Sequence, residues 1–313
     1  MKVFILGGAG AVGSATAYCL TTRNTADEIV ISDTNEDLAE SVAMDLSQCA
    51  ISVSGTRIRT GKWEDAKGSD VVVVAAGLPA ALATHNAGKD IVSMLPMIRS
   101  IADGIRNYCP EAVVLSMTNP LDEFNYILYR FCNLPARQFI ALSENDSIRF
   151  RYAISEHLNV NSSEVDGFVI GTHGPGKVPL FSSVMVNHEP RSFTAGERSQ
   201  ICLHMNTWWK KFLAVSGTRT ATWTTGSSCA LVIEHLKGSK SGPICCSCVT
   251  GDDFSIGLPV YLNASGVVEP LNLKLAEDES VGFEKSKSDL RSSLGYVLAL
   301  LEEQGVKLPP VAD

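Results

Sequence analysis

The sequence predicts an α/β protein, with a doubly wound parallel sheet in the first half and an α+β second half. In the first half, short apolar runs alternate with helical patterns, which is typical of strands joined by right-handed helical crossovers. The valine-rich runs are apolar at successive positions, as expected for parallel strands covered on both faces. From about Asn145 onward the alternation stops, so we expect two domains, residues 1–144 and 145–313.

The elements of the first half follow one another in a regular order. Apolar runs predict strands at residues 2–8, 28–33, 70–77, 112–120 and 138–143. Helical patterns predict helices at residues 14–22, 35–48 and 94–108. Because each helix follows a strand, we expect a single sheet with helices on both faces.

The second half is expected to contain short antiparallel strands and longer helices. Strands are predicted at residues 165–171, 178–187, 242–251 and 257–263. Helices are predicted at residues 196–215, 220–237 and 277–304. Trp223, at the start of the second of these helices, is expected to pack in the core rather than to contact a substrate.

Composition excludes several classes of protein. The chain has 313 residues and a formal net charge of −8, which argues against nonspecific nucleic-acid binding because that requires a basic surface. The N-terminal apolar run is too short for a signal peptide, and no segment approaches the roughly 18 apolar residues of a membrane span. We therefore expect a cytoplasmic protein with no membrane partner.

The nine cysteines include a cluster that could suggest a metal site. Cys245, Cys246 and Cys248 lie close together, but they fall in a β-type run and no second cluster completes a zinc site. Buried strand thiols are the favoured interpretation, and no metal is expected.

A glycine-rich turn follows the first predicted strand. In "GGAGAVG", Gly8 permits the tight turn, Gly10 allows the backbone to approach a pyrophosphate, and Gly13 lets helix and strand pack closely. Asp33 ends the second strand 20 residues after Gly13, where a carboxylate would accept hydrogen bonds from the adenosine ribose. This carboxylate would repel a 2′-phosphate, so the pattern predicts a Rossmann domain that binds NAD rather than NADP.

Three further motifs carry polar side chains, and each has an ordinary structural interpretation. Asn119 in "TNPLDEF" could belong to a simple turn, and His173 in "VIGTHGPGKVP" could be a loop histidine. In "ENDSIRFR", Asp146 could cap a helix that carries Arg149 on its surface. Their order and spacing, taken together, favour a shared function.

With these motifs the chain resembles the lactate/malate dehydrogenase family over almost its whole length, from "GGAGAVG" to "GDDFSIGLPVYLNASGVVEPLNLKL". The resemblance implies that His173 accepts a proton and that Asp146 orients it. It also implies that Arg149 binds the substrate carboxylate, and that Asn119 contacts both substrate and nicotinamide. The second half would then be a substrate domain facing the NAD-binding domain across a cleft.

The resemblance implies a larger set of site residues as well. The cofactor-binding set is Gly8, Gly10, Ala11, Val12, Gly13, Asp33, Ala76, Gly77 and Asn119. The substrate-binding set is Arg149, Asn119, Ala80, Asn86 and Thr222. The family also forms dimers or tetramers, which implies a homodimer or homotetramer.

The residue types suit the oxidation of a secondary alcohol to a ketone. The reaction removes a hydride and a proton, and His173 can take the proton because the pKa of histidine lies near neutrality. Asp146 would fix the tautomer of the imidazole and stabilise its charged form. The planar fork of Arg149 can bind a carboxylate in a bidentate way that lysine cannot.

The loop after the third predicted strand departs from the family pattern. Family loops usually carry two arginines, and the matching positions here are Ala80 and Asn86. The first arginine binds the distal carboxylate of malate and the second polarises the reacting carbonyl. Pro175 also stands where an aspartate is common. Ordinary malate and lactate are therefore not the expected substrates.

Several interpretations of the altered loop stay open. The first is a 2-hydroxy acid with a larger or less acidic side chain, with His85 or Lys89 polarising the carbonyl. The second is an unusual polar acid whose extra group meets Lys89, Lys177 or Arg219. Further alternatives are a non-catalytic NAD-binding protein, malate dehydrogenase proper, and an NAD-dependent glycoside hydrolase.

Overall fold

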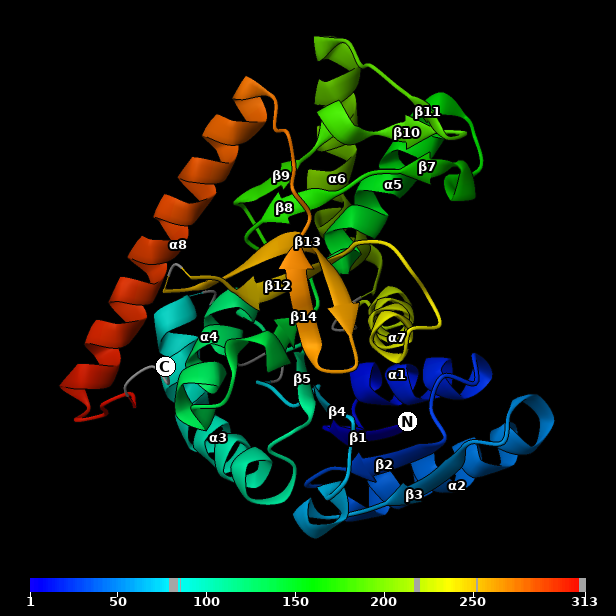
Figure 1. Cartoon of the computed structure of the whole chain (residues 1–313), viewed down its shortest axis with the longest axis vertical. Helices are drawn as coiled ribbons and strands as arrows, with labels where there is room; N and C mark the ends of the chain where they lie inside the picture. The colour runs from blue at the N-terminus through cyan, green and yellow to red at the C-terminus, as the bar shows by residue number, and fades with distance from the viewer. Residues whose placement is uncertain (79–83, 85, 217–219, 252, 310–313) are drawn as a thin grey trace.

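The computed structural model describes residues 1–78, 84, 86–216, 220–251 and 253–309. It confirms an α/β protein with a largely parallel central sheet (Figure 1). The parallel strands lie in the order β3-β2-β1-β4-β5-β6, the strand order of doubly wound dinucleotide-binding folds. Their bounds are β1 (Lys2–Leu6), β2 (Glu28–Ser32), β3 (Arg57–Thr60), β4 (Val71–Val74), β5 (Val113–Ser116) and β6 (Phe139–Ala141).

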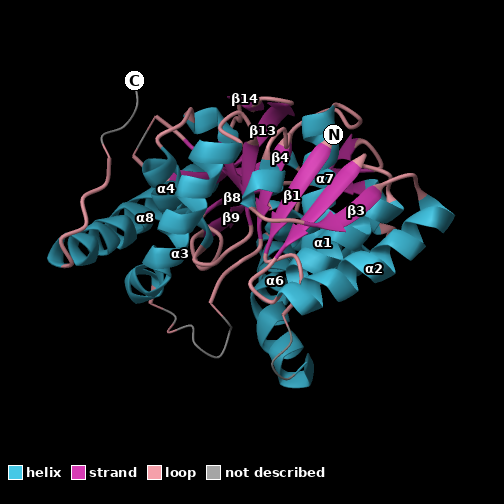
Figure 2. Ribbon diagram, turned by 90° about the horizontal axis from the view of Figure 1, so that it is seen from below, coloured by secondary structure: helices cyan, strands magenta, loops and turns pink. Residues whose placement is uncertain are grey.

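Helices cover both faces of this sheet, because alternate strand residues point to opposite sides. Phe4 and Val72 pack toward α3 (Ala87–Tyr108) and α4 (Leu121–Cys132). Ile5 and Val73 pack on the other side, toward α1 (Ala11–Thr22) and α2 (Glu36–Val53). Figure 2 shows the strands between these helical layers. The uninterrupted apolar runs of the sequence reflect this burial on both faces.

Helix α3 begins seven residues earlier than the pattern predicts, at Ala87 instead of residue 94. The sequence pattern did not indicate this earlier start because Gly88 and Pro96, which lie inside the helix, both weaken a helical pattern. A Cβ on Gly88 would lie 2.7 Å from the Tyr296 ring, so glycine allows α8 (Glu277–Glu303) to pack closely against α3. The structure also contains β3, α4 and α5 (Glu144–Leu158), which the pattern did not predict.

The second half extends the same sheet instead of building its own. β12 (Ile244–Val249) pairs antiparallel with β6, and β13 (Ser255–Asn263), β8 (Val169–Gly171) and β9 (Lys177–Pro179) follow in that order. β14 (Gly266–Pro270) pairs with β13, while β7 (Val165–Asp166), β10 (Met185–Val186) and β11 (Glu189–Pro190) form a small separate sheet. The remaining helices are α6 (Ala195–Ser216) and α7 (Trp223–Lys237). The predicted strand at residues 165–171 is therefore two strands in different sheets.

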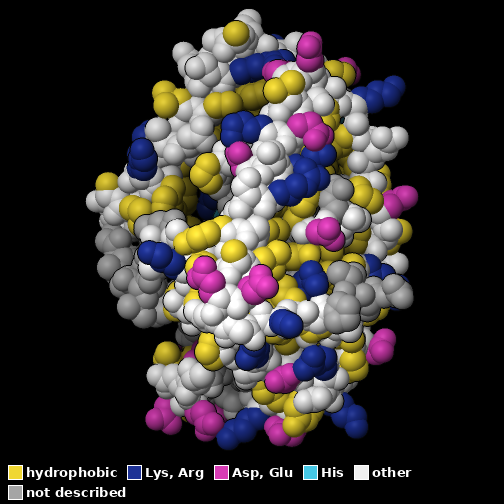
Figure 3. Space-filling view, turned by 90° about the vertical axis from the view of Figure 1, so that its left-hand side faces the viewer, with side chains coloured by type: hydrophobic (Ala, Val, Ile, Leu, Met, Phe, Trp, Pro, Cys, Tyr) yellow, Lys and Arg dark blue, Asp and Glu magenta, His cyan; other side chains and the backbone are white. Residues whose placement is uncertain are grey.

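Helix α8 packs against both halves of the chain, against α3 in the first and β9 in the second (Figure 1). The face that carries it bears acidic and basic side chains close to one another (Figure 3). Within the described ranges, no helix has the length and apolarity needed to cross a membrane.

The cysteine run lies in β12 as predicted, and burial raises the pKa of the Cys248 thiol to about 12. Trp223 is 71% exposed, so its predicted core position was wrong.

Short 3-10 helices occupy several of the connections. Their bounds are Trp63–Ala66, Ala136–Gln138, Ser162–Glu164 and Phe181–Ser183. The last of these interrupts the strand predicted at residues 178–187, which appears as β9 and β10. The division at residue 144 stays a prediction.

Candidate active site

The glycine-rich turn joins β1 to α1 as the sequence predicts. The backbone N–H of Gly8 donates to the Ser32 carbonyl at 3.1 Å. A Cβ on Gly13 would lie 2.2 Å from the Gly7 carbonyl oxygen, so only glycine fits there. Within the part of the chain that the structure describes, no side chain caps the N-terminus of α1, which begins at Ala11 and continues through Val12. Free N–H groups at a helix start suit a bound phosphate.

The loops that follow β4 and β5 meet beside this turn. A Cβ on Gly7 would lie 2.6 Å from the backbone nitrogen of Ala76, which follows β4. Thr118, which follows β5, donates its hydroxyl to the Ala76 carbonyl at 2.6 Å and lies beside Gly77. This is the point at which the strand order reverses, where open α/β sheets bind their ligands. The exposed Asn119 directly follows Thr118 at this edge.

Asp33 lies on the opposite side of the turn, at the end of β2. Its Oδ2 accepts the backbone N–H of Ala9 at 3.1 Å, and its Oδ1 accepts the N–H of Asn35 at 3.0 Å. The carboxylate is therefore held against the glycine-rich turn. The residues around the turn fit a dinucleotide, since the glycines leave space that a Cβ would fill and a carboxylate is held beside that space.

Replacing Gly13 by alanine tests this fit. The added Cβ would clash with the Gly7 carbonyl, so we expect the free energy of unfolding to fall by about 1–3 kcal/mol. NADH binding, followed by fluorescence, should weaken because the turn must open. Gly55→Ala is the matched control, since a Cβ there meets nothing within 4 Å. Equal behaviour of the two variants would contradict the interpretation.

The second half contributes a histidine–aspartate pair. Asp146 lies in the first turn of α5, and His173 follows β8. The Nδ1 atom of His173 lies 2.7 Å from Asp146 Oδ2, a hydrogen-bond distance. The backbone N–H of His173 donates to Asp122 Oδ2 at 2.7 Å, and Ser247 donates its hydroxyl to Asp122 Oδ1 at 2.6 Å. The histidine is thus held at its ring and at its backbone.

Two further cations approach Asp146. Arg149 Nη1 and Lys177 Nζ each lie 3.5 Å from Asp146 Oδ1. The guanidinium of Arg149 also stacks on the Trp208 ring, 4.7 Å from its centroid. Within the described part of the chain, Arg149 Nε is buried and has no hydrogen-bond partner. A single carboxylate therefore contacts a histidine, an arginine and a lysine.

These charges oppose the effects of burial on ionisation. Burial alone would raise the pKa of Asp146, but His173, Lys177 and Arg149 together hold it below its usual range. Burial alone would lower the pKa of His173, but Asp146 raises it. Burial raises the pKa of Asp122 to about 7, although its hydrogen bonds oppose this. The site therefore favours an ionised Asp146 beside a readily protonated histidine.

The remaining predicted residues lie at other places. Ala80, like His85 and Arg219, lies outside the described residues. The side chain of Asn86 accepts the backbone N–H of Lys89 at 3.0 Å and so caps α3. Thr222 occupies the N-cap position of α7, and among the described residues its side chain makes no capping hydrogen bond. The roles assigned to these residues stay predictions.

Sequence reasoning missed some residues of the site and left Lys177 as one of several options. Asp122 had a weak signal, because it lies within "TNPLDEF", two residues after Pro120. Ser247 lies within the cysteine run, where the sequence gave no indication of a site residue. The sequence also did not indicate that Trp208 contacts Arg149. Such contacts depend on how distant segments pack.

A Rossmann sheet with a glycine-rich turn, facing a histidine–aspartate pair beside an arginine, defines the class of NAD-dependent dehydrogenases. Residues 1–141 match the family model described as lactate/malate dehydrogenase, NAD binding domain. Malate dehydrogenase of Halobacterium salinarum is 30% identical over 290 residues, which cover 89% of this chain and 93% of that protein. L-lactate dehydrogenase 1 of Bacillus cereus is 29% identical over 308 residues, covering 94% and 98%.

Solved structures agree with these relatives. The lactate dehydrogenase of Cryptosporidium parvum, complexed with lactic acid and NAD, has a TM-score of 0.88 and 27% identity, covering 95% of this chain and 97% of that one. Malate dehydrogenase from Picrophilus torridus also has a TM-score of 0.88, with 28% identity over 97% and 99% of the two chains. The chain belongs to the lactate/malate dehydrogenase family. It is an NAD-dependent oxidoreductase that acts on CH–OH groups.

Proposed function

We propose that the chain interconverts a 2-hydroxy acid and a 2-oxo acid, and that His173 and Asp146 form its proton relay. The observation that carries this proposal is the 2.7 Å contact between His173 Nδ1 and Asp146 Oδ2, with Arg149 on the same carboxylate. A protein that only bound NAD would have no use for this combination. The relatives named as lactate and malate dehydrogenases support the same substrate class.

Each residue has a separate role in this mechanism. When bound, the nicotinamide of NAD supplies or accepts the hydride. The Nε2 atom of His173 takes the hydroxyl proton during oxidation and returns a proton to the carbonyl oxygen during reduction. Asp146 holds Nδ1 in the protonated tautomer and stabilises the imidazolium. Asn119 donates a hydrogen bond to the reacting oxygen.

Arg149 is the proposed anchor for the substrate carboxylate. Stacking on Trp208 restrains the plane of its guanidinium, so less conformational entropy is lost when a carboxylate binds. Asp146 neutralises only part of the positive charge, because Lys177 contacts the same oxygen. An anionic substrate is therefore favoured in the cleft.

We propose that this substrate is neither ordinary malate nor lactate. The sequence contains no arginine between Gly77 and Ile98, so neither family arginine of the loop has a counterpart there. A distal carboxylate such as that of malate lacks its usual partner, and the carbonyl lacks its usual polarising group. A 2-hydroxy acid with a larger or less acidic side chain suits the alanine-rich loop better.

NADH oxidation against a panel of 2-oxo acids tests the proposal. The panel includes pyruvate, oxaloacetate, branched and aromatic 2-oxo acids, and acids with phosphonate or amide side chains. We expect the highest kcat/KM for an acid other than pyruvate or oxaloacetate. Preference for either of those two would overturn the substrate proposal. Tight NADH binding without turnover on any acid would favour a non-catalytic protein.

We also propose a cytoplasmic homodimer or homotetramer. All nine cysteines are free, which supports a reducing compartment. The oligomeric state rests on the family resemblance. Sedimentation of the purified chain in an analytical ultracentrifuge tests it.

A further inference from the structure

Lys177 has no step of its own in the proposed mechanism, although it contacts the same Asp146 oxygen as Arg149. It is the first residue of β9, and its register partner across the β8–β9 hairpin is Gly171, two residues before His173. The backbone N–H of Lys177 donates to the Gly174 carbonyl at 3.4 Å, which closes the turn. One short turn therefore carries both the histidine and the lysine.

This turn is tightly packed, which fixes the backbone between His173 and Lys177. Gly171 has a φ of +92°, and a Cβ there would lie 2.5 Å from the Gly176 carbonyl oxygen. The Ser286 hydroxyl of α8 accepts the backbone N–H of Thr172 at 3.0 Å. The backbone that carries Lys177 and His173 cannot shift far without disturbing this packing.

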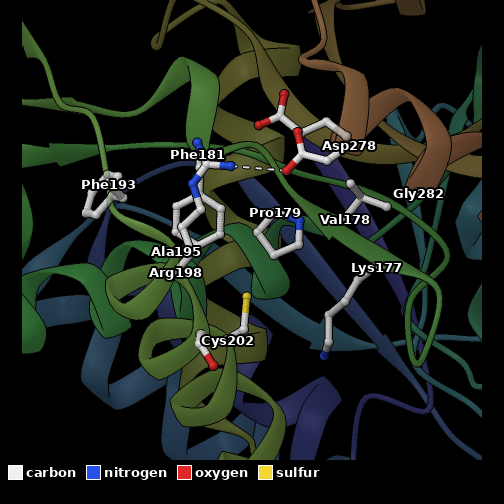
Figure 4. Close-up of a pocket in the computed structure, with 12 residues that line it drawn as sticks. Lys177, Val178, Pro179, Phe181, Phe193, Ala195, Arg198, Cys202, Asp278 and Gly282 are labelled. Atoms are coloured by element: carbon white, nitrogen blue, oxygen red, sulfur yellow. Dashed lines mark hydrogen bonds and ion pairs between the residues drawn. The ribbon is translucent and has the colours of Figure 1, made fainter.

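The ammonium of Lys177 is directed at Asp146. Lys177 lines a cavity of about 590 Å³. In Figure 4 its ammonium lies at the end away from Asp278. Asp278 pairs with Arg198 of α6 at 3.1 Å, and Glu279 accepts the backbone N–H of Ser182 at 2.8 Å. Among the described residues, the ion pair recorded for Lys177 is with Asp146, at 3.5 Å.

The charged groups around the relay come from several elements. Asp146 and Arg149 belong to α5, and Asp122 of α4 accepts the backbone N–H of His173. Arg198 of α6 and the two acids of α8 line the cavity on the other side of Lys177. The side chain of Asp146 is only 3% exposed, so little solvent screens its ion pairs.

We propose that Lys177 is a positioning residue of the proton relay, which holds the Asp146 carboxylate against His173. This role rests on the proposed function. Arg149 fixes the same Oδ1 atom from within α5, and Lys177 fixes it from the strand that follows the His173 turn. Lys177 thereby links the two elements that carry the relay.

The test is the titration of the His173 imidazole in Lys177→Met. Release of the Asp146 carboxylate would weaken its ion pair with the ring, so we expect the His173 pKa to fall. NMR of protein with labelled histidine measures it, and the signal missing from His173→Gln assigns it. Lys177→Arg should restore the wild-type titration. Lys285→Met is the matched control, because Lys285 is exposed and pairs with Asp289 on α8.

Turnover of the best acid from the panel adds a second readout. We expect Lys177→Met to lower kcat about tenfold, because proton transfer depends on the orientation of the base, and to change KM little. An unmoved or a raised pKa of His173 would overturn the positioning role, because a rise would show that Lys177 acts on the ring only as a like charge. A rise in KM confined to acids with a second anionic group would overturn it too, since Lys177 would then bind substrate. The titration decides the question even if no acid is turned over, so failure of the proposed function remains distinguishable.

Discussion

Replacing His173 by glutamine is expected to lower kcat by about three orders of magnitude while NADH binding is kept. General acid–base catalysis contributes roughly 10²–10⁴-fold, and glutamine cannot accept the proton that the substrate hydroxyl loses. The amide can still hydrogen-bond Asp146, so the fold around the turn should persist. Stopped-flow and steady-state rates measure the loss, and NADH fluorescence reports binding.

His204→Gln is the matched control for this variant. His204 lies on α6 against the Tyr152 ring, 5.8 Å between centroids, and takes no part in the proposed relay. It should keep wild-type turnover. Full activity of His173→Gln with the true substrate would show that another group takes the proton.

The pH dependence of the wild type follows from the same residue. Asp146 raises the pKa of His173 above its usual value against the effect of burial. Oxidation needs the neutral ring, so its rate should rise with pH through this raised pKa. Reduction needs the imidazolium, so its rate should fall over the same range. The ion pair also stabilises the fold fully below about pH 6.5, the unfolded pKa, and this contribution is lost as pH rises through the folded pKa.

Replacing Asp146 by asparagine is expected to cause the second large loss. The variant leaves Arg149 and Lys177 beside an uncharged group, and breaking a buried pair in this way costs about 3–5 kcal/mol. Both cations are 19% exposed, so the lower end of that range applies. The pKa of His173 should fall, because burial and the two cations would act without Asp146. We expect kcat to fall by about two to four orders of magnitude.

Chemical denaturation and the pH profile of kcat measure the two effects of Asp146→Asn separately. In the wild type the folded pKa of Asp146 is depressed, so its stabilisation is present above about pH 3.8 and is lost as pH falls through the folded pKa. The variant should lack this acid-dependent loss. Asp166→Asn, at an exposed position of β7, is the control and should leave both stability and turnover unchanged.

The features that the sequence predicted well depend on neighbours along the chain. Gly8, Gly10 and Gly13 lie within one strand–helix turn, so their spacing alone predicts the close packing that the structure contains. The start of α3 was missed for the opposite reason. Gly88 weakens the local helical pattern. The reason for a glycine at this position is the close packing of α8 against it, which the local sequence does not indicate.

The surroundings of the relay depended on contacts that no local pattern reports. Asp122 and the backbone of His173 are 51 residues apart, and Lys177 lies 31 residues from Asp146. Trp208 reaches Arg149 because α6 packs on α5. The family resemblance indicated the histidine, the aspartate and the arginine, but not the residues that hold them.

The sequence by itself determined the doubly wound sheet and the dinucleotide turn, because hydrophobic periodicity and glycine spacing act over a few residues. Only the tertiary structure decided that β12, β13, β8 and β9 continue the same sheet beyond β6. This continuation carries the His173 turn to the start of α5, where Asp146 is buried among cations. Burial and the distances between charges set the ionisation of the site, and both arise only when distant segments pack together.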